Sequence, residues 1–71
     1  MDNNFLQKFA NNLKRLRKQK GLTQLQLESD NVSRSMISLV ETAKSDLTVS
    51  TAKAIADSMG IHIKELFDFD E

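Results

Sequence analysis

Two segments that read as short helices, separated by a tight turn, constrain the fold of this chain most strongly. The first begins within the sequence GLTQ at residues 21–24, and the second is SRSMISLVE at residues 33–41. Thr23 and Gln26 have the spacing of a helix capping box, and Asp30-Asn31 is typical of a turn. The sequence therefore predicts one helix over about residues 23–30 and another, capped by Ser33, over about residues 33–42.

The remainder of the chain has the periodicity of helices as well. Proline is absent, only two glycines are present, and apolar residues recur at steps of three and four. We expect a helix from about Asn4 to Lys20 that stops at Gly21, a helix capped by Thr48 or Ser50 that stops at Gly60, and a short, apolar last helix that contains Leu66. Together with the two segments above, these predict an all-α domain of five helices with short connections.

Composition removes several classes of function. The 71 residues suffice for one domain with a small core, and the chain has no cysteine and a single histidine, His62. A disulfide framework, a metal site, a catalytic cluster, a cofactor and a small-molecule ligand are therefore not expected. No apolar run approaches the roughly 18 residues of a membrane span, and no signal peptide is recognisable. We expect a cytoplasmic, non-enzymatic domain with no membrane partner and a tendency to self-associate.

Charge is divided unevenly, although the whole chain is formally neutral. Residues 1–35 carry a net charge of +4, and residues 36–71 carry a net charge of −4. A molecule with this polarity can turn its basic half towards phosphates and its acidic half away from them. The same charges can equally belong to an ordinary solvated surface, so charge alone leaves nucleic-acid binding open.

Four motifs in order resemble one known family. They are FxxxLxxLR from Phe9, GLTQ from Gly21, VSRSxISxxE from Val32, and IAxxMGI from Ile55 followed by ELF at residues 65–67. Together they are similar to Cro and phage-repressor-like helix-turn-helix domains over about Phe9 to Phe67. The resemblance implies that the five helices form a lambda-repressor-like DNA-binding domain. Within that family, the chain looks most like the controller proteins of restriction–modification systems, which share the DLTV-like stretch found here at residues 46–49.

The chain departs from the family pattern in three places. The stretch between Gln24 and Val32 is one residue shorter, Ala43 stands where the family usually has glycine, and Leu39 stands where a polar or basic residue is common. These departures bear on the depth and tilt of the helix over residues 33–42.

The resemblance implies that this helix enters the major groove of DNA. Arg34, in its first turn, has a forked guanidinium that can take guanine O6 and N7 together; the alternatives are a phosphate contact or a free surface charge. Ser35 and Ser38 are short polar residues on the same side, and Leu39 can pack on a thymine methyl group. Ser38 can instead be a buried small residue, and Leu39 can be purely structural. The predicted base contacts are Arg34, Ser35, Ser38 and Leu39.

Phosphate contacts are predicted at the helix ends next to these residues. The resemblance implies that Gln24 donates to a phosphate, at a helix start where free N–H groups favour an anion; the alternative is an ordinary solvated residue. Ser33 caps the following helix and can touch a phosphate as well. Thr42, Lys44 and Ser45 form the loop after that helix, and Lys44 is the strongest candidate because its charge drives counterion release.

Two further sets of residues are predicted to form structural contacts, one within the chain and one between two chains. The resemblance implies an ion pair between Arg17 and Glu41; the alternative is two independent surface charges. The last helix carries more apolar side chains than a monomer edge leaves in water. We therefore expect a dimer interface there, with core packing as the alternative, formed by Ile63, Leu66, Phe67 and Phe69.

These residues favour a homodimeric transcription factor that binds double-stranded DNA at a pseudo-palindromic operator. The alternatives are an antitoxin-type protein-interaction module and a phage-type repressor, each of which regulates its own operon. The short acidic end of the chain, residues 68–71, is compatible with a protein partner but is too short to wrap one.

Overall fold

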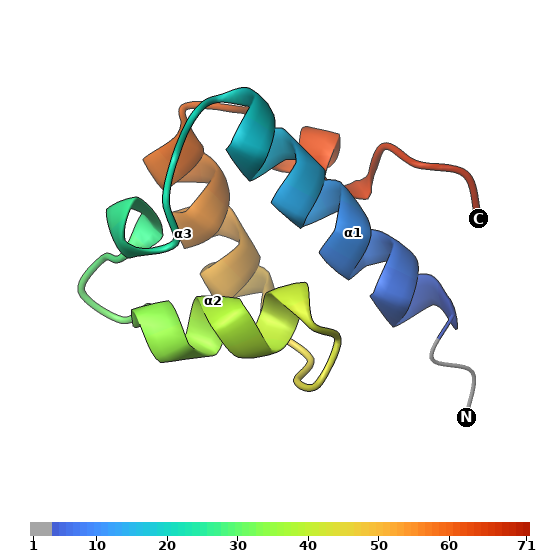
Figure 1. Ribbon diagram of the computed structural model, residues 1–71, viewed down its shortest axis with the longest axis horizontal. Coiled ribbons are helices and arrows are strands. Elements are labelled where there is room, and N and C mark those ends of the chain that lie inside the picture. The colour runs from blue at the N-terminus through green and yellow to red at the C-terminus, as the bar shows by residue number, and fades with distance from the viewer. Residues whose placement is uncertain (1–3) are drawn as a thin grey trace.

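The computed structural model describes residues 4–71 and is built from helices (Figure 1). Its three α-helices are α1 (Asn4–Gln19), α2 (Arg34–Glu41) and α3 (Val49–Met59), and two short 3₁₀ segments are η1 (Leu25–Leu27) and η2 (Ile63–Phe67). The expected all-α class is therefore present, but the expectation of five helices is wrong in detail, because the second and fifth elements are short 3₁₀ segments. Within residues 4–71, no helix is both long enough and apolar enough to cross a membrane.

The second predicted helix forms only the 3₁₀ segment η1. Its backbone hydrogen bonds join residues three positions apart, and the chain then becomes extended. The capping box is present: Thr23 N donates to Gln26 Oε1 at 2.8 Å, and Gln26 N donates to Thr23 Oγ1 at 3.2 Å. Glu28 then adopts an extended conformation, with ψ of 146°. Ser29 and Val32 exchange both backbone hydrogen bonds, at 3.0 and 3.1 Å, so these groups are not available to continue a helix.

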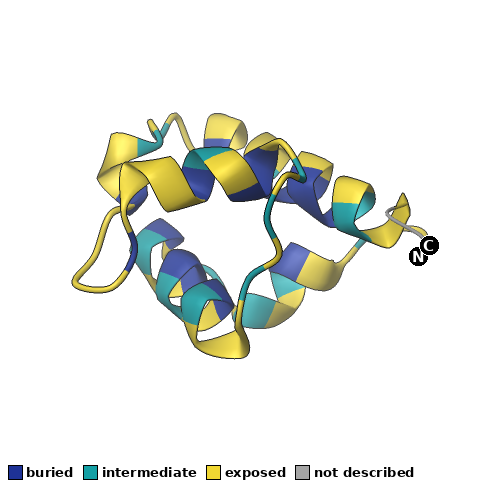
Figure 2. Ribbon diagram, turned by 90° about the horizontal axis from the view of Figure 1, so that it is seen from below, coloured by how far each residue is buried: buried dark blue, intermediate teal, exposed yellow. Residues whose placement is uncertain are grey.

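The core lies between α1 on one side and α2, α3 and the 3₁₀ segments on the other (Figures 1 and 2). Leu27 and Val32, on either side of the compressed turn, are both buried, and this anchors the turn despite its shortness. The largest fully buried side chains are Phe9, Leu13, Leu27, Ile37, Ile55 and Leu66.

The segment η2 is fixed to α1 by a buried asparagine. Asn12 Nδ2 donates to the backbone oxygens of Glu65 and Leu66, at 2.9 Å each, and its Oδ1 accepts from Arg15 Nη2 at 2.6 Å. All polar atoms of this buried amide therefore have partners, which makes the contact specific for asparagine. The C-terminal segment after η2 continues along the first half of α1, where the rings of Phe69 and Phe5 lie 5.2 Å apart (Figure 1).

The helix starts predicted from serine and threonine are confirmed. Ser33 Oγ accepts from the backbone N–H of Met36 at 3.1 Å and caps α2. Thr48 Oγ1 accepts from the N–H of Thr51 at 3.0 Å and caps α3, so Thr48 rather than Ser50 is the cap. These caps set where α2 begins and how the loop before α3 ends.

All three α-helices end in the same way, with one residue in the left-handed conformation. Two of these residues are Gly21, with φ of 69°, and Gly60, with φ of 71°; the third is Ala43, with φ of 56°. After α2, Ala43 N donates to Val40 O at 3.0 Å and Lys44 N donates to Leu39 O at 2.9 Å, which is the Schellman pattern. Alanine carries a steric cost there that glycine avoids, so the chain ends α2 with local strain.

Candidate nucleic-acid interface

The outer face of α2 presents most of the predicted base contacts to solvent. Arg34, Ser35 and Leu39 are exposed, whereas Ser38 is half-buried. The opposite face, with Ile37 and Val40, is buried in the core. One side of a short helix is therefore held by packing while the other side is open to a partner, as direct readout in a major groove requires.

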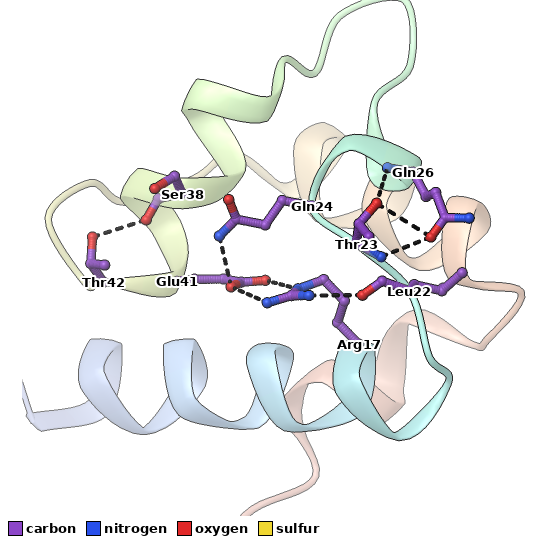
Figure 3. A network of polar contacts seen from close by, with 8 residues as sticks. All are labelled: Arg17, Leu22, Thr23, Gln24, Gln26, Ser38, Glu41 and Thr42. Carbon is purple, nitrogen blue, oxygen red and sulfur yellow. Dashed lines mark hydrogen bonds and ion pairs between the residues drawn. The ribbon is translucent and has the colours of Figure 1, made fainter.

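A buried ion pair joins α1 to the last residue of α2 (Figure 3). Arg17 Nε donates to Glu41 Oε2 at 2.6 Å, and Arg17 Nη2 donates to Glu41 Oε1 at 3.0 Å. Arg17 Nη1 also donates to the backbone oxygen of Leu22 at 2.7 Å. The two side chains are only 10% and 1% exposed. Two parallel hydrogen bonds fix the orientation of both groups, which sets the angle between α1 and α2.

The hydrogen bonds of this pair also affect the protonation of Arg17. The side-chain hydrogen bond to Glu41 raises the pKa of Arg17, burial opposes this by disfavouring the charged form, and the negative charge of Glu41 adds to the increase. Arg17 therefore stays positively charged although it is buried.

Gln24 belongs to the same network, a contact that the sequence analysis missed. Its Nε2 donates to Glu41 Oε1 at 3.0 Å, and in Figure 3 the carboxylate of Glu41 lies between Gln24 and Arg17. One amide hydrogen of Gln24 is therefore engaged within the protein, and only the second can serve the predicted phosphate contact. The network connects α1, the start of η1 and the end of α2.

The loop after α2 offers fewer donors than the sequence indicates. Thr42 Oγ1 donates to the backbone oxygens of Ser38 and Leu39, at 2.9 and 3.2 Å, and Ser45 Oγ donates to the oxygen of Asp46 at 3.2 Å. Each hydroxyl has one proton, so Thr42 and Ser45 must give up these bonds before either can donate to a phosphate. Lys44 is exposed. It is the best placed of the three for a phosphate contact.

The start of α2 has two side-chain caps instead of one. Besides Ser33, Glu28 participates: its Oε2 accepts from the backbone N–H of Arg34 at 2.8 Å. Because Ser33 Oγ acts as the acceptor in its own cap, its hydroxyl proton remains able to donate to a phosphate. Sequence reasoning missed Glu28, and the only signal for it was the short stretch between Gln24 and Val32, which brings Glu28 close to the start of α2.

The structure changes the predicted dimer surface. Leu66 is 0% exposed, in the core of its own chain, so it is not available to a second chain and its assignment to the interface is wrong. Ile63 and Phe69 are half-buried, and both pack against the core of the same chain. Phe67 is partly exposed, with its ring 4.9 Å from that of Phe9. The four residues therefore do not form one exposed surface.

A different apolar surface is open instead. Phe5, Leu47, Val49 and Phe67 line a hollow of about 330 Å³, called the apolar hollow below, to which Asp46 and Thr48 also contribute. Val49, at the first position of α3, is 81% exposed, and Phe5 and Phe67 are also exposed. The apolar spacing of this helix predicts that Val49 belongs to its buried stripe with Ala52 and Ile55, and this prediction is wrong, because Val49 lies beside the Thr48 cap at the exposed start of α3. Three exposed apolar side chains around one hollow are a candidate contact surface.

Comparison with known proteins agrees with this geometry. The helix-turn-helix family matches residues 13–66. Among solved structures, the restriction-modification controller protein C.AhdI from Aeromonas hydrophila is 32% identical, and the match covers 87% of this chain and 96% of that chain with a TM-score of 0.81. No curated protein matches the chain. The family match spans the network around Glu41, α2 and its caps, and α3. The chain therefore belongs to the Cro/C1-type helix-turn-helix family and is a DNA-binding transcription regulator.

Proposed function

We propose that this protein binds a pseudo-palindromic operator as a homodimer and controls the transcription of a restriction–modification system. The observation that carries the DNA-reading part is the arrangement of α2. Its first turn is fixed by two caps, its last residue is held by the pair between Arg17 and Glu41, and its outer face is open. A helix held at both ends can bring side chains to base edges with little ordering cost.

In this proposal, Arg34 makes the principal base contact. Its guanidinium takes guanine O6 and N7 in the major groove, and Ser35 adds a short polar contact beside it. Leu39, further along the exposed face, packs on a thymine methyl group. Ser38 is half-buried, so it can contact a base only where α2 lies deepest in the major groove.

Phosphate contacts flank these bases. Lys44 supplies the charge, the hydroxyl of Ser33 supplies a donor at the start of α2, and Gln24 supplies its second amide hydrogen. Helix starts and lysine side chains are typical phosphate ligands in protein–DNA complexes. These three residues lie at the two ends of α2 and beside η1, so they can fix its position along the groove.

Pairing of two chains through the apolar hollow is the assembly that we infer. Six large apolar side chains are exposed among the described residues, and Phe5, Val49 and Phe67, three of the six, border this one hollow. Burying them against a second copy removes them from water and relates the two α2 helices by a two-fold axis. Half-sites about 34 Å apart, one turn of DNA, would then be read together.

The control of a restriction–modification system is supported by the similarity to C.AhdI. That protein is described as a restriction-modification controller, and 96% of its chain is matched here. The match leaves almost no part of C.AhdI without a counterpart, so the two chains share the same domain content over that length.

Selection of bound duplexes from a random library tests the proposal. We expect the enriched sequence to contain two inverted half-sites with centres about one helical turn apart. In the source genome, that sequence should lie upstream of a restriction endonuclease gene or of the gene for this protein. Enrichment of single, unpaired half-sites would contradict the homodimer, and an operator that is far from any restriction–modification gene would contradict the proposed control.

A further inference from the structure

The compressed turn before α2 places a carboxylate at the start of the recognition helix. Glu28 leaves η1 in an extended conformation, is exposed, and uses Oε2 to accept from the backbone N–H of Arg34 at 2.8 Å. It borders a shallow hollow together with Ser33 and Met36, in the first turn of α2. The carboxylate is therefore anchored beside the residue that reads bases in the proposed function.

An anchored carboxylate at this position has two consequences. Its second oxygen, Oε1, has no hydrogen bond within the described residues, so it can accept one from outside the protein. Its Oε2 also occupies the N–H of Arg34, so a phosphate contact at the start of α2 is left to the hydroxyl of Ser33. A carboxylate with one free acceptor oxygen beside Arg34 suits the amino group of a base.

Major-groove chemistry identifies which bases carry such a group. Cytosine presents its N4 amino group and adenine its N6 amino group, whereas guanine and thymine present acceptors at O6 and O4. Adenine also presents N7, an acceptor that would face the carboxylate unfavourably, so cytosine is the better partner. A carboxylate accepting from cytosine N4 is an established direct contact in protein–DNA complexes.

We propose that Glu28 is a specificity-determining residue that accepts a hydrogen bond from cytosine N4, at a base pair next to the guanine read by Arg34. The inference rests on the proposed function, because it requires α2 to lie in the major groove. It assigns to this chain a further base-reading side chain, which lies outside the helix itself and is made possible by the turn that is one residue shorter than the family pattern.

The substitution Glu28→Gln tests this directly. The glutamine oxygen can still accept from the N–H of Arg34, while its other atom becomes an NH₂ donor instead of an acceptor. In duplex selection at fixed salt, the variant should lose the preference for cytosine at one position by about tenfold, the usual scale for one mismatched pair. It should favour guanine or thymine there, and its thermal unfolding should stay close to that of the original protein.

A matched control separates base reading from charge. Asp30 is exposed in the same turn, so Asp30→Asn removes one negative charge without changing the cap of α2. Both variants should bind random duplexes more tightly, because each removes repulsion of phosphate. Only Glu28→Gln should change the selected sequence.

Three outcomes are distinguishable. If Glu28→Gln and Asp30→Asn select the same sequence as the original protein, the base contact of Glu28 is refuted. If Arg34→Ala changes the selected sequence while Glu28→Gln does not, this inference fails and the proposed function stands. If the original protein selects no sequence at all, both fail together.

Discussion

The guanidinium of Arg17 meets the carboxylate of Glu41 in a two-point contact, with Nε 2.6 Å from Oε2 and Nη2 3.0 Å from Oε1. The contact joins residues 24 positions apart and ties α1 to the end of α2. Gln24 donates to the same carboxylate from a third element. Because α2 carries the exposed side chains of Arg34, Ser35 and Leu39, this buried pair determines the orientation in which these side chains are presented.

Removing one partner of the pair should destabilise the domain strongly. In Arg17→Met the carboxylate of Glu41 stays buried with Gln24 as its remaining partner, and we expect a loss of about 3 kcal/mol in the free energy of unfolding. The double variant Arg17→Met/Glu41→Leu should recover part of that loss, because no unpaired charge remains. Chemical denaturation of the four proteins of this cycle measures the coupling. Purely additive losses would contradict the pairing.

The contribution of Arg17 to the free energy of unfolding should not vary between pH 7 and pH 9. Its pKa is raised in the folded protein by the hydrogen bond to Glu41. A group with a raised folded-state pKa stabilises the fold fully below its unfolded pKa and loses that contribution only as pH rises through the folded value. Since the unfolded pKa of arginine already lies far above the neutral range, Arg17 remains charged at neutral and mildly alkaline pH. The mutant cycle should therefore give the same coupling free energy between Arg17 and Glu41 at pH 7 and at pH 9.

Replacing Ala43 by glycine should stabilise the protein. Ala43 has φ of 56°, in the conformation that the two other α-helix ends give to glycine. Ala43→Gly relieves the steric cost but adds freedom to the unfolded chain, so we expect a net gain of about 0.5–1 kcal/mol. Thermal or urea unfolding measures it.

The reverse change at the end of α3 is the matched control for Ala43→Gly. Gly60 has φ of 71°, and a Cβ atom there would meet no other atom within 4 Å, so Gly60→Ala introduces backbone strain alone. It should destabilise the protein by about 1 kcal/mol. Equal signs for the two substitutions would show that the left-handed conformation is not the cause.

Lys44→Ala should weaken binding to all duplexes by the same factor. Lys44 is an exposed cation in the loop after α2, and a phosphate contact carries no base information. The slope of log K against log salt should fall by about 1 in magnitude. The matched control is Lys64→Ala, which removes an exposed lysine from η2 and should leave the slope unchanged. A change in the selected sequence with Lys44→Ala would indicate base contact instead.

Val49→Asp should produce folded monomers. Val49 is 81% exposed, so a carboxylate is tolerated in the free chain, whereas between two paired hollows it would lose water in a lining that already contains the carboxylate of Asp46. Sedimentation should show single chains with unchanged helix content, and operator binding should weaken and lose its dependence on the second power of protein concentration. Phe67→Asp is a poorer test, because Phe67 packs on buried Phe9 and its loss also affects the fold. A dimer that persists in Val49→Asp would place the interface elsewhere.

The α-helices follow closely from local sequence. Periodic apolar residues and the glycine stop predict a helix over about Asn4 to Lys20, and α1 spans Asn4–Gln19. The Ser33 cap was identifiable because serine, followed by a helical pattern, satisfies free backbone N–H groups. Thr48 and Ser50 could not be distinguished in this way, since both have side chains that can act as caps.

The 3₁₀ segments show where local patterns stop being informative. The capping box of Thr23 and Gln26 forms at the start of an α-helix or of a shorter 3₁₀ turn, and only the backbone pairing of Ser29 with Val32 decides between them. Likewise, the apolar spacing around Leu66 does not reveal which side chains fill the core of the same chain. Leu66 fills that core, and exposed apolar surface is found around Val49.

The candidate site was only partly visible in the sequence. Only the family resemblance predicts the pair of Arg17 and Glu41, because nothing in the residues between them specifies the contact. The bond from Gln24 to Glu41 and the bond from Arg34 to Glu28 depend on how three elements meet. Side chains that form hydrogen bonds between separate elements leave no periodic signal in the sequence, so only the folded arrangement reveals these contacts.

The proposed contact of Arg34 with a guanine in the major groove can be tested with a modified operator. Affinity is measured for the selected operator and for the same operator with 7-deazaguanine, which lacks the N7 acceptor, at the position assigned to Arg34. Both duplexes are titrated with the original protein and with Arg34→Ala. We predict that the base change and Arg34→Ala each cost about 1–3 kcal/mol, and that the base change has no further effect once Arg34 is absent. Additive losses from the two changes would contradict the contact and, with it, the assigned role of α2.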